Sequence, residues 1–339
     1  MTSDNLQRAK QIVRQLQQQF DGAADDALAD TLAGHVSTDY HWRGMHPFYE
    51  QTGATAVVDN FWLPLRRSFS SLQRREDIFF AGSNYVDDNA STWVVGMGHF
   101  MGLFDNDWLG IPATQKLAML RYAEFHRVDG DRITESAFFC DVLSIMQQAG
   151  CYPLPPQTGA EIIQPGPLTQ DGILLEPQAA EEGTTTMQLV NKMIADLSEL
   201  NESGNDRCPP EVLARCWHDD MAWYGPAGIG ATYTISRYQE QHQYPFRTQL
   251  KDKVFNGHVA RIAEGNYCGF FGWANLTNTP TGGFLGLPAN ETRADMRVVD
   301  IYRRDGDKLA ENWIFIDLLH WLSMQGLDVL QRVRDVTRV

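Results

Sequence analysis

Apolar residues recur at helical spacing near the start of the chain and again just past its middle. The clearest run has apolar side chains three or four positions apart, at Met187, Val190, Met193, Ile194, Leu197 and Leu200. Residues 6–20 repeat this pattern with fewer apolar positions. Such periodicity predicts two amphipathic helices, each packing one face on a sheet. Two further helical stretches are expected at about 54–70 and 234–250.

The later part of each half is rich in aromatic and β-branched residues, which predicts strands at 92–101 and 267–274. Further on, apolar runs at 296–302 and 309–316 flank Asp305-Gly306, a dipeptide typical of a tight β-hairpin turn. Each half therefore predicts two helices, three strands and a short terminal helix. The expected fold class is α+β, with two tandem cone-shaped domains, each a curved antiparallel sheet wrapped around helices.

Short sequence motifs recur along the chain at a nearly constant spacing. Trp42-Arg43-Gly44 recurs 181 positions later as Trp223-Tyr224-Gly225, and the Leu-Gly-Ile-Pro-Ala of 109–113 recurs 176 positions later as Leu-Gly-Leu-Pro-Ala at 285–289. Several matches in the same order indicate a tandem duplication.

The two copies are separated by a stretch of different composition. Residues 151–186 hold six of the 15 prolines and neither Lys nor Arg, which is typical of an extended linker. The predicted organisation is a first domain at 1–150, a Pro-rich linker at 151–186 and a second domain at 187–339.

The second copy carries the more specific sequence motifs. They are Trp223-Tyr224-Gly225-Pro226, a helical segment around His242, the Gly-Phe-Leu-Gly-Leu-Pro of 283–288, and the run from Asp300 to Asp317. In this order they resemble the SnoaL-like polyketide cyclase family, within the nuclear transport factor 2-like fold. The resemblance implies a cone with an apolar pocket, no metal and no organic cofactor.

The chain also departs from that family pattern. The resemblance implies an acid/base aspartate three residues before the position that matches Asp317, and this chain has Ile314 there. The first copy keeps the frame but has Phe138 at that position, Phe61 in place of His242 and Glu124 in place of Asp300.

The Asp305-Gly306 turn predicts a register for the hairpin. If residue 304 pairs with 307, then Asp300 pairs with Glu311 on one face, with Trp313 and Phe315 further along it. Two carboxyls in an apolar pocket share a proton, so one of them can act as acid and the other as base. The first copy repeats the pair as Glu124 and Glu135.

Simpler roles stand beside each of these candidates. Asp300 or Glu311 can instead pair with Arg297, Arg303 or a helix N-terminus, and a β-bulge in either strand would break the predicted register. His242 is a candidate proton shuttle or a satisfied core histidine.

The remaining pocket candidates are aromatic or stand next to a helix. The predicted lining consists of Trp223, Tyr224, Phe271, Trp273 and Trp313, with Trp42 as a first-copy counterpart. Asp317 and its counterpart Asp141 are included, although each precedes an apolar helix, where an N-cap is expected.

Composition limits the classes of partner. The 28 basic and 43 acidic residues give a net charge of −15, which disfavours nucleic acid and anionic membrane surfaces. No apolar run reaches the length of a membrane span, and the start of the chain lacks a signal-peptide pattern. Five scattered cysteines without a Cys-x-x-Cys pair suggest reduced thiols, so a cytoplasmic location is expected. Neither His41 with His46 nor His218 with its neighbouring acids has the spacing of a metal site.

These observations lead to two functional hypotheses. The first is a cofactor-independent enzyme that acts by general acid/base chemistry on a small, largely apolar carbonyl or ester compound, by cyclisation, isomerisation, dehydration or hydrolysis. Asp300, Glu311 and His242 would be its catalytic residues. The second is a non-catalytic small-molecule-binding or assembly module of the same fold. In either case the two copies are expected to form an internal pseudo-dimer, and a homodimer is possible.

Overall fold

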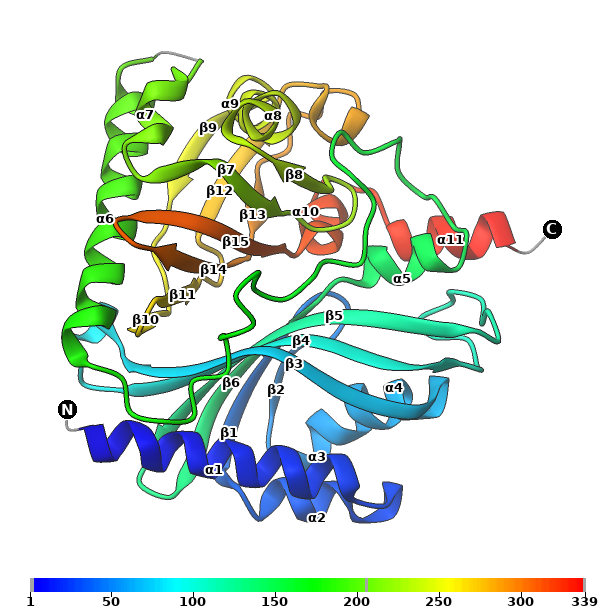
Figure 1. Cartoon of the computed structure of the whole chain (residues 1–339). Coiled ribbons are helices and arrows are strands. Elements are labelled where there is room, and N and C mark those ends of the chain that lie inside the picture. Colours follow the sequence, from blue (N-terminus) through cyan, green and yellow to red (C-terminus); the bar gives the residue numbers. More distant parts are fainter. Residues whose placement is uncertain (1–2, 205–206, 338–339) are drawn as a thin grey trace. The chain divides into compact units, whose positions relative to one another are not determined.

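The computed structural model describes residues 3–204 and 207–337 and divides into two compact units. The first unit comprises the chain up to Cys151, together with Leu168–Pro177 and the segment from Leu330 onward. The second comprises Tyr152–Pro167 and Gln178–Val329. Figure 1 shows both as mixtures of helices and strongly curved strands.

The first unit begins with the amphipathic helix α1 (Ser3–Gly22), which buries Ala9, Val13, Leu16 and Phe20. Helix α1 packs on strands β3 and β4 of a six-stranded sheet with the order β2-β1-β6-β5-β4-β3. The strands are β1 (Val36–Gly44), β2 (Tyr49–Thr52), β3 (Phe69–Ser83), β4 (Thr92–Phe104), β5 (Leu117–Asp129) and β6 (Arg132–Cys140). The remaining helices are α2 (Leu28–Ala33), α3 (Ala54–Val57), a π-helical turn (Val58–Trp62), α4 (Leu63–Ser68) and α5 (Val142–Gln148), with 3-10 turns at Asp25–Ala27 and Tyr85–Asp87.

The second unit repeats this order, beginning with the long helix α6 (Ala180–Glu202) on strands β10 and β11 (Figure 1). Its main sheet has the order β10-β11-β14-β15-β7-β8, beside a three-stranded sheet β13-β12-β9. The strands are β7 (Trp217–Tyr224), β8 (Ala231–Tyr233), β9 (Leu250–Phe255), β10 (Ala260–Glu264), β11 (Tyr267–Phe271), β12 (Leu276–Pro280), β13 (Ala294–Met296), β14 (Val298–Asp305) and β15 (Lys308–Ile316). The helices are α7 (Pro210–Ala214), α8 (Ile235–Tyr238), a π-helical turn (Gln239–Gln243), α9 (Tyr244–Thr248), a 3-10 turn (Phe284–Gly286) and α10 (Leu318–Met324). The last helix, α11 (Val329–Thr337), belongs to the first unit from Leu330 onward.

The expected α+β class with curved, mainly antiparallel sheets is confirmed. Two details differ from the sequence prediction. Each six-stranded sheet contains one parallel pair, β1 with β6 and β7 with β15. Several strands were not predicted, because polar residues interrupt their apolar runs: β1, β2 and β3 in the first unit, and β7, β8, β9, β10 and β12 in the second.

The segment between the copies is extended but shorter than predicted. Helix α6 begins at Ala180, inside the stretch expected as linker. Before it, Ile173 forms a β-bridge with Phe79 in the first unit, and Ala160 forms one with Ala231 in the second. The segment therefore lies along the surfaces of the units and contributes backbone hydrogen bonds to each.

The predicted hairpin is present, but its register is not the expected one. Asp305 pairs with Lys308, and a bulge at Ala310 then places Glu311 opposite Arg303 and Ile314 opposite Asp300. The prediction that Asp300 and Glu311 are neighbours is wrong. The first unit has a bulge at the same place, so Glu135 lies opposite Arg127, and the predicted pair with Glu124 is wrong as well.

The two units differ most where their long strands cross the sheet. In the first unit β3 and β4 are continuous over 15 and 13 residues. In the second unit the corresponding strands are interrupted, once between β9 and β10 and once between β11 and β12. The interruptions remove side chains from the middle of the sheet and leave room for a cavity.

Candidate ligand pocket and acid/base site

The second unit contains a cavity of about 590 Å³. It lies between helix α6, the helical segment α8–α9 and the strands around the two interruptions. Its apolar wall consists of Met193, Ile194, Leu197, Phe246, Phe255, Phe270, Leu276, Met296, Val298, Ile314 and Ile316. A mostly apolar cavity of this size is typical of a site for a small organic molecule.

Asp300 on β14 supplies the one carboxyl group among the described residues that line this cavity. Asn312 donates from Nδ2 to its Oδ1 at 3.3 Å, and Tyr302, two residues along the same strand, donates its hydroxyl. Desolvation raises the pKa of Asp300 to about 7, although both hydrogen bonds lower it. A carboxyl group with this pKa exchanges a proton near neutral pH, so it can serve as acid or base.

His242 also lines this cavity. It stands in the π-helical turn, only 7% exposed, with its ring stacked on Trp223 at a centroid distance of 4.1 Å. Its Nδ1 is buried without a hydrogen-bond partner. Desolvation lowers the pKa of His242 to about 3, so the imidazole is neutral at physiological pH.

Glu311 belongs to the other face of the sheet. It forms a buried ion pair with Arg303, the simpler role considered above. Trp313 and Tyr224 lie on the same side, with their rings stacked at 5.5 Å, and Trp313 donates from Nε1 to the Pro165 carbonyl at 2.9 Å. The bulge at Ala310 explains this outcome, because it turns these side chains away from Asp300.

Four further predicted lining residues do not reach the cavity wall. Trp223 stacks on the ring of His242 and does not itself line the cavity. Phe271 points to the opposite side of its strand from Phe270 and is buried in the core. The Arg297 guanidinium lies 3.9 Å from the ring centroid of Trp273. Asp317 caps helix α10 by accepting from the His320 amide at 3.2 Å, and it pairs with Arg297 at 3.6 Å. Its predicted role as an N-cap is confirmed, and its predicted place in the lining is wrong.

Several residues of the site were not predicted. Tyr302 had a visible signal, because residues two apart on a strand share a face. Tyr238, one helical turn before His242, had a similar signal, and burial raises the pKa of its phenol so that it keeps its proton. Three more lining residues had no signal in the sequence: Arg247 on α9, Lys253 on β9, and His258 in the interruption between β9 and β10.

The place in the first unit that corresponds to the deep part of this cavity, around Glu124, is nearly filled, although a separate cavity of about 260 Å³ lies beside it at Arg66 and Arg74. The cavity at Glu124 is about 30 Å³, enough for roughly one water molecule. Trp42 and Phe138 line it, and Phe61, at the position of His242, packs against both at 5.5 and 4.8 Å. Asp141 caps helix α5 through the Ser144 amide at 3.1 Å, and Glu135 pairs with Arg43 at 2.8 Å and Arg127 at 2.6 Å.

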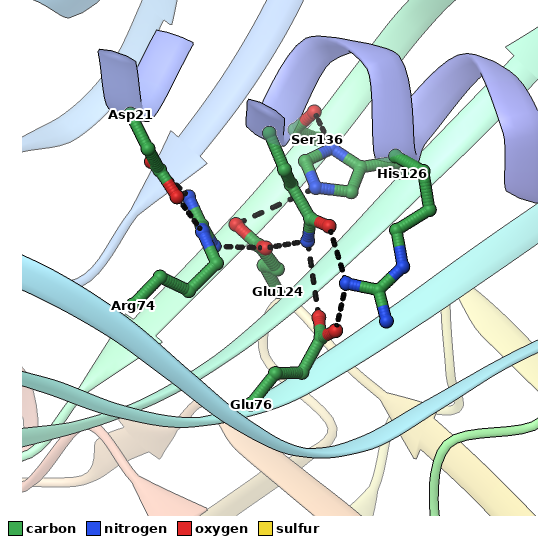
Figure 2. Close-up of polar contacts among 8 residues, drawn as sticks. Asp21, Arg74, Glu76, Glu124, His126 and Ser136 are labelled. Atoms are coloured by element: carbon green, nitrogen blue, oxygen red, sulfur yellow. Dashed lines mark hydrogen bonds and ion pairs between the residues drawn. The ribbon is translucent and has the colours of Figure 1, made fainter. Parts of the chain in front are cut away.

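A buried cluster of charges occupies the polar end of this small cavity (Figure 2). Arg74 contacts Glu124 at 2.5 Å and Asp21 at 2.9 Å, and Arg14 contacts Glu76 at 2.5 Å. Burial alone would raise the pKa of Glu124, but Arg74 and His126 outweigh it and hold the value at about 2. At Glu76 desolvation prevails over Arg14 and Arg74, which raises the pKa of that carboxyl to about 7.

The same cluster places a hydroxyl, an imidazole and a carboxylate in line. His126 Nδ1 lies 2.7 Å from Ser136 Oγ, and its Nε2 lies 3.5 Å from Glu124. The order is that of a nucleophile with its base and orienting acid. However, Ser136 is 1% exposed and the adjoining cavity holds about one water, so the structure leaves no room for a substrate there.

Two features are absent from residues 3–204 and 207–337. No group of three or more His, Cys, Asp or Glu side chains is placed to hold a metal ion. No helix there is both long enough and apolar enough to cross a membrane.

Several solved structures match about two fifths of this chain. A protein from Jannaschia sp. CCS1 assigned as a SnoaL-like polyketide cyclase is 16% identical, with a TM-score of 0.36, and the match covers 44% of this chain and 95% of that one. An NTF2-like protein from Burkholderia xenovorans LB400 is 12% identical over 42% of this chain and 97% of that one, with a TM-score of 0.34.

A third match is IdmH from Streptomyces antibioticus, assigned as a polyketide cyclase. It is 17% identical over 40% of this chain and 98% of that one, with a TM-score of 0.32. No family model and no curated protein matches the sequence. At these identities the likeness concerns the fold and carries no information about a substrate.

Proposed function

We propose that the second unit is a cofactor-independent enzyme that acts by general acid/base chemistry on a small, largely apolar carbonyl or ester compound. The observation that carries the proposal is the carboxyl of Asp300, with its pKa raised to about 7, on the wall of the 590 Å³ cavity. A carboxyl desolvated in this way costs folding energy, and such groups concentrate at functional sites.

The side chains around Asp300 suggest a sequence of proton transfers. The ionised carboxyl accepts a proton from a carbon next to the substrate carbonyl, and the electrons of the broken C–H bond move onto the carbonyl oxygen. The phenol of Tyr238, which keeps its proton, donates a hydrogen bond to that oxygen. Asp300 then returns the proton to another atom of the substrate, which gives isomerisation. Alternatively, the carbanion attacks an internal carbonyl, whose π electrons move onto its oxygen, and Asp300 gives the proton to this alkoxide, which completes cyclisation.

The neighbours of Asp300 assist by position. Tyr302 and Asn312 orient the carboxyl through hydrogen bonds. His242 contributes a neutral wall, since its pKa of about 3 excludes a charged role at neutral pH. Glu311, committed to Arg303, has no part in the proposed steps.

The test compares wild type with Asp300→Asn. A thermal-shift screen of small aromatic, polyketide-like, lactone and ester compounds identifies ligands, and each ligand is then assayed for conversion. We expect ligands that stabilise both proteins but are converted by the wild type alone. Asp219→Asn, which changes an exposed carboxyl on β7, is the matched control and should retain activity. Equal conversion by Asp300→Asn would refute the proposal.

One observation favours the alternative of a binding module. Ile314 faces Asp300 from the neighbouring strand, so the site has a single carboxyl where a carboxyl pair was predicted. A ligand that stabilises both proteins and is converted by neither would support this alternative.

A further inference from the structure

The most exposed residues of the cavity wall mark its mouth. Ser198, Asn201 and Gly204, at the end of α6 and just beyond it, are exposed, as is Phe255 on β9 with 61% of its surface accessible. By contrast Met193, His242, Phe270 and Met296 are buried and form the floor. The cavity therefore opens between the end of α6 and strand β9.

Two cationic side chains belong to this mouth. Arg247 near the end of α9 donates to the Asn201 side chain. Lys253 on β9 donates from Nζ to the Arg247 carbonyl at 3.0 Å, and it lies 5.8 Å from the ring centroid of Phe246. Both side chains are half-buried and border the cavity. The contacts connect them into one group, so their charges act on the same region.

The charge of this group extends toward the acid/base residue. Arg247 lowers the pKa of Tyr238, whereas Asp300 raises it. Tyr238 therefore lies within electrostatic reach of both Arg247 and Asp300. A ligand that spans the cavity meets positive charge at the mouth and a titratable acid deeper inside.

The charge balance of the wall is opposite to that of the protein. Among the described residues that line the cavity there are two formal cations and one acid, and that acid is half-protonated near pH 7. The whole chain has a net charge of −15. A positive mouth on a strongly acidic protein favours an anionic ligand group locally, while general attraction of anions to the surface is weak.

We propose that the ligand of this cavity is an amphiphilic anion, with a carboxylate or a similar group bound by Arg247 and Lys253 and an apolar body inside. The identification of this ligand as the substrate rests on the function proposed above, whereas the proposal that it binds here does not depend on that function. Arg and Lys donate charge-assisted hydrogen bonds to such anions. Anchoring the anion at the mouth places the apolar body along Phe246 and Phe270, with its far end at Asp300.

The experiment uses two fluorescent probes that differ in one charged group. The anion is 8-anilinonaphthalene-1-sulfonate, and its uncharged counterpart is N-phenyl-1-naphthylamine. Both are titrated against the full chain, the double variant Arg247→Gln/Lys253→Gln and the control Arg237→Gln/Lys251→Gln. The control removes the same charge from exposed positions outside the cavity wall.

We expect the mouth variant to bind the sulfonate at least about tenfold more weakly and the uncharged probe within about twofold of wild type. The control should change neither by more than about twofold. Unchanged affinity for the sulfonate in the mouth variant would overturn the proposal, as would an equal loss for both probes, which would indicate a damaged pocket. Neither probe is converted, so this result is independent of whether Asp300 is catalytic.

Discussion

Asp300 lies directly opposite Ile314 across strands β14 and β15, and both side chains line the cavity of the second unit. The same register in the first unit places Glu124 opposite Phe138. There Arg74 ion-pairs with Glu124, and aromatic rings fill the space. Equivalent positions thus hold a titratable acid at an open cavity in one unit and a permanently ionised carboxylate in a filled core in the other. This divergence is the reason for assigning ligand binding to the second unit.

The activity proposed for Asp300 predicts a pH profile. A base with a pKa of about 7 is mostly protonated at about pH 6 and mostly ionised at about pH 8. For a ligand that the wild type converts, kcat/KM should therefore rise by about tenfold over this interval. Steady-state rates across the range give the answer, with Asp219→Asn as the comparison. A flat profile would mean that another group, or none, transfers the proton.

The same carboxyl predicts a pH dependence of stability. Its pKa is raised in the folded state, so its unfolded form ionises first and stability is lost as pH rises from about 4 to about 7. Asp300→Asn should remove this loss and be more stable than wild type by about 2 kcal/mol at pH 8, with a smaller gain at pH 5. Urea unfolding at both values measures the difference. A gain that is larger at pH 5 would contradict the direction of the shift.

Much of the fold could be predicted because its signals are local or repeated. The helical periodicity around Met193, the Asp305-Gly306 turn and the internal repeat each concern residues close in sequence or recurring words. Asp300 and His242 were found because the repeat and the resemblance pointed to them. The pKa values of these two side chains could not be predicted from the sequence, since a pKa depends on the groups that surround a side chain in space.

The remaining errors have specific physical causes. The turn pairs Asp305 with Lys308, where 304 with 307 was predicted, and one extra residue, Ala310, then reverses the faces of the side chains that follow it. No apolar or polar pattern around Ala310 distinguishes a bulge from regular pairing. The interruptions that expose His258 and Lys253 depend on where two strands stop pairing. The closure of the first unit depends on Arg74, which reaches Glu124 from a strand 50 residues earlier.

The charge cluster of the first unit predicts a large effect of Arg74. Arg74→Met leaves Glu124 ionised and buried without its main partner, so unfolding at pH 7 should cost about 3–5 kcal/mol less than in wild type. The exposed neighbour Arg75→Met, on the same strand, should change stability by less than about 0.5 kcal/mol. The double variant Arg74→Met/Glu124→Gln should regain much of the loss. If the double variant is no more stable than Arg74→Met, the buried charge is not the cause.

His242 should limit stability in mild acid. Its pKa is lowered in the folded state, so its contribution to stability is present above about pH 6.5 and is lost as pH falls toward 3. His242→Phe copies Phe61 of the first unit and removes a buried nitrogen that has no partner. It should stabilise the protein by about 1 kcal/mol at pH 7 and by more at pH 5. Thermal unfolding at the two values tests this, and a variant less stable than wild type at both would show that the imidazole makes a needed contact.

The Asp300–Ile314 pair allows the predicted carboxyl pair to be built. In Ile314→Asp the two carboxyls face each other across adjacent strands, with Cβ atoms about 5 Å apart, and in a desolvated cavity they should hold one proton between them near neutral pH. Repulsion then grows as the second proton leaves, so this variant should lose stability more steeply than wild type as pH rises from about 6 to about 9. Unfolding curves of Ile314→Asp and of Ile314→Asp/Asp300→Asn separate the causes, because the double variant keeps the new carboxyl but lacks its neighbour. A similar decline in both would assign the loss to a buried aspartate alone and would place Asp300 too far from position 314 for proton sharing.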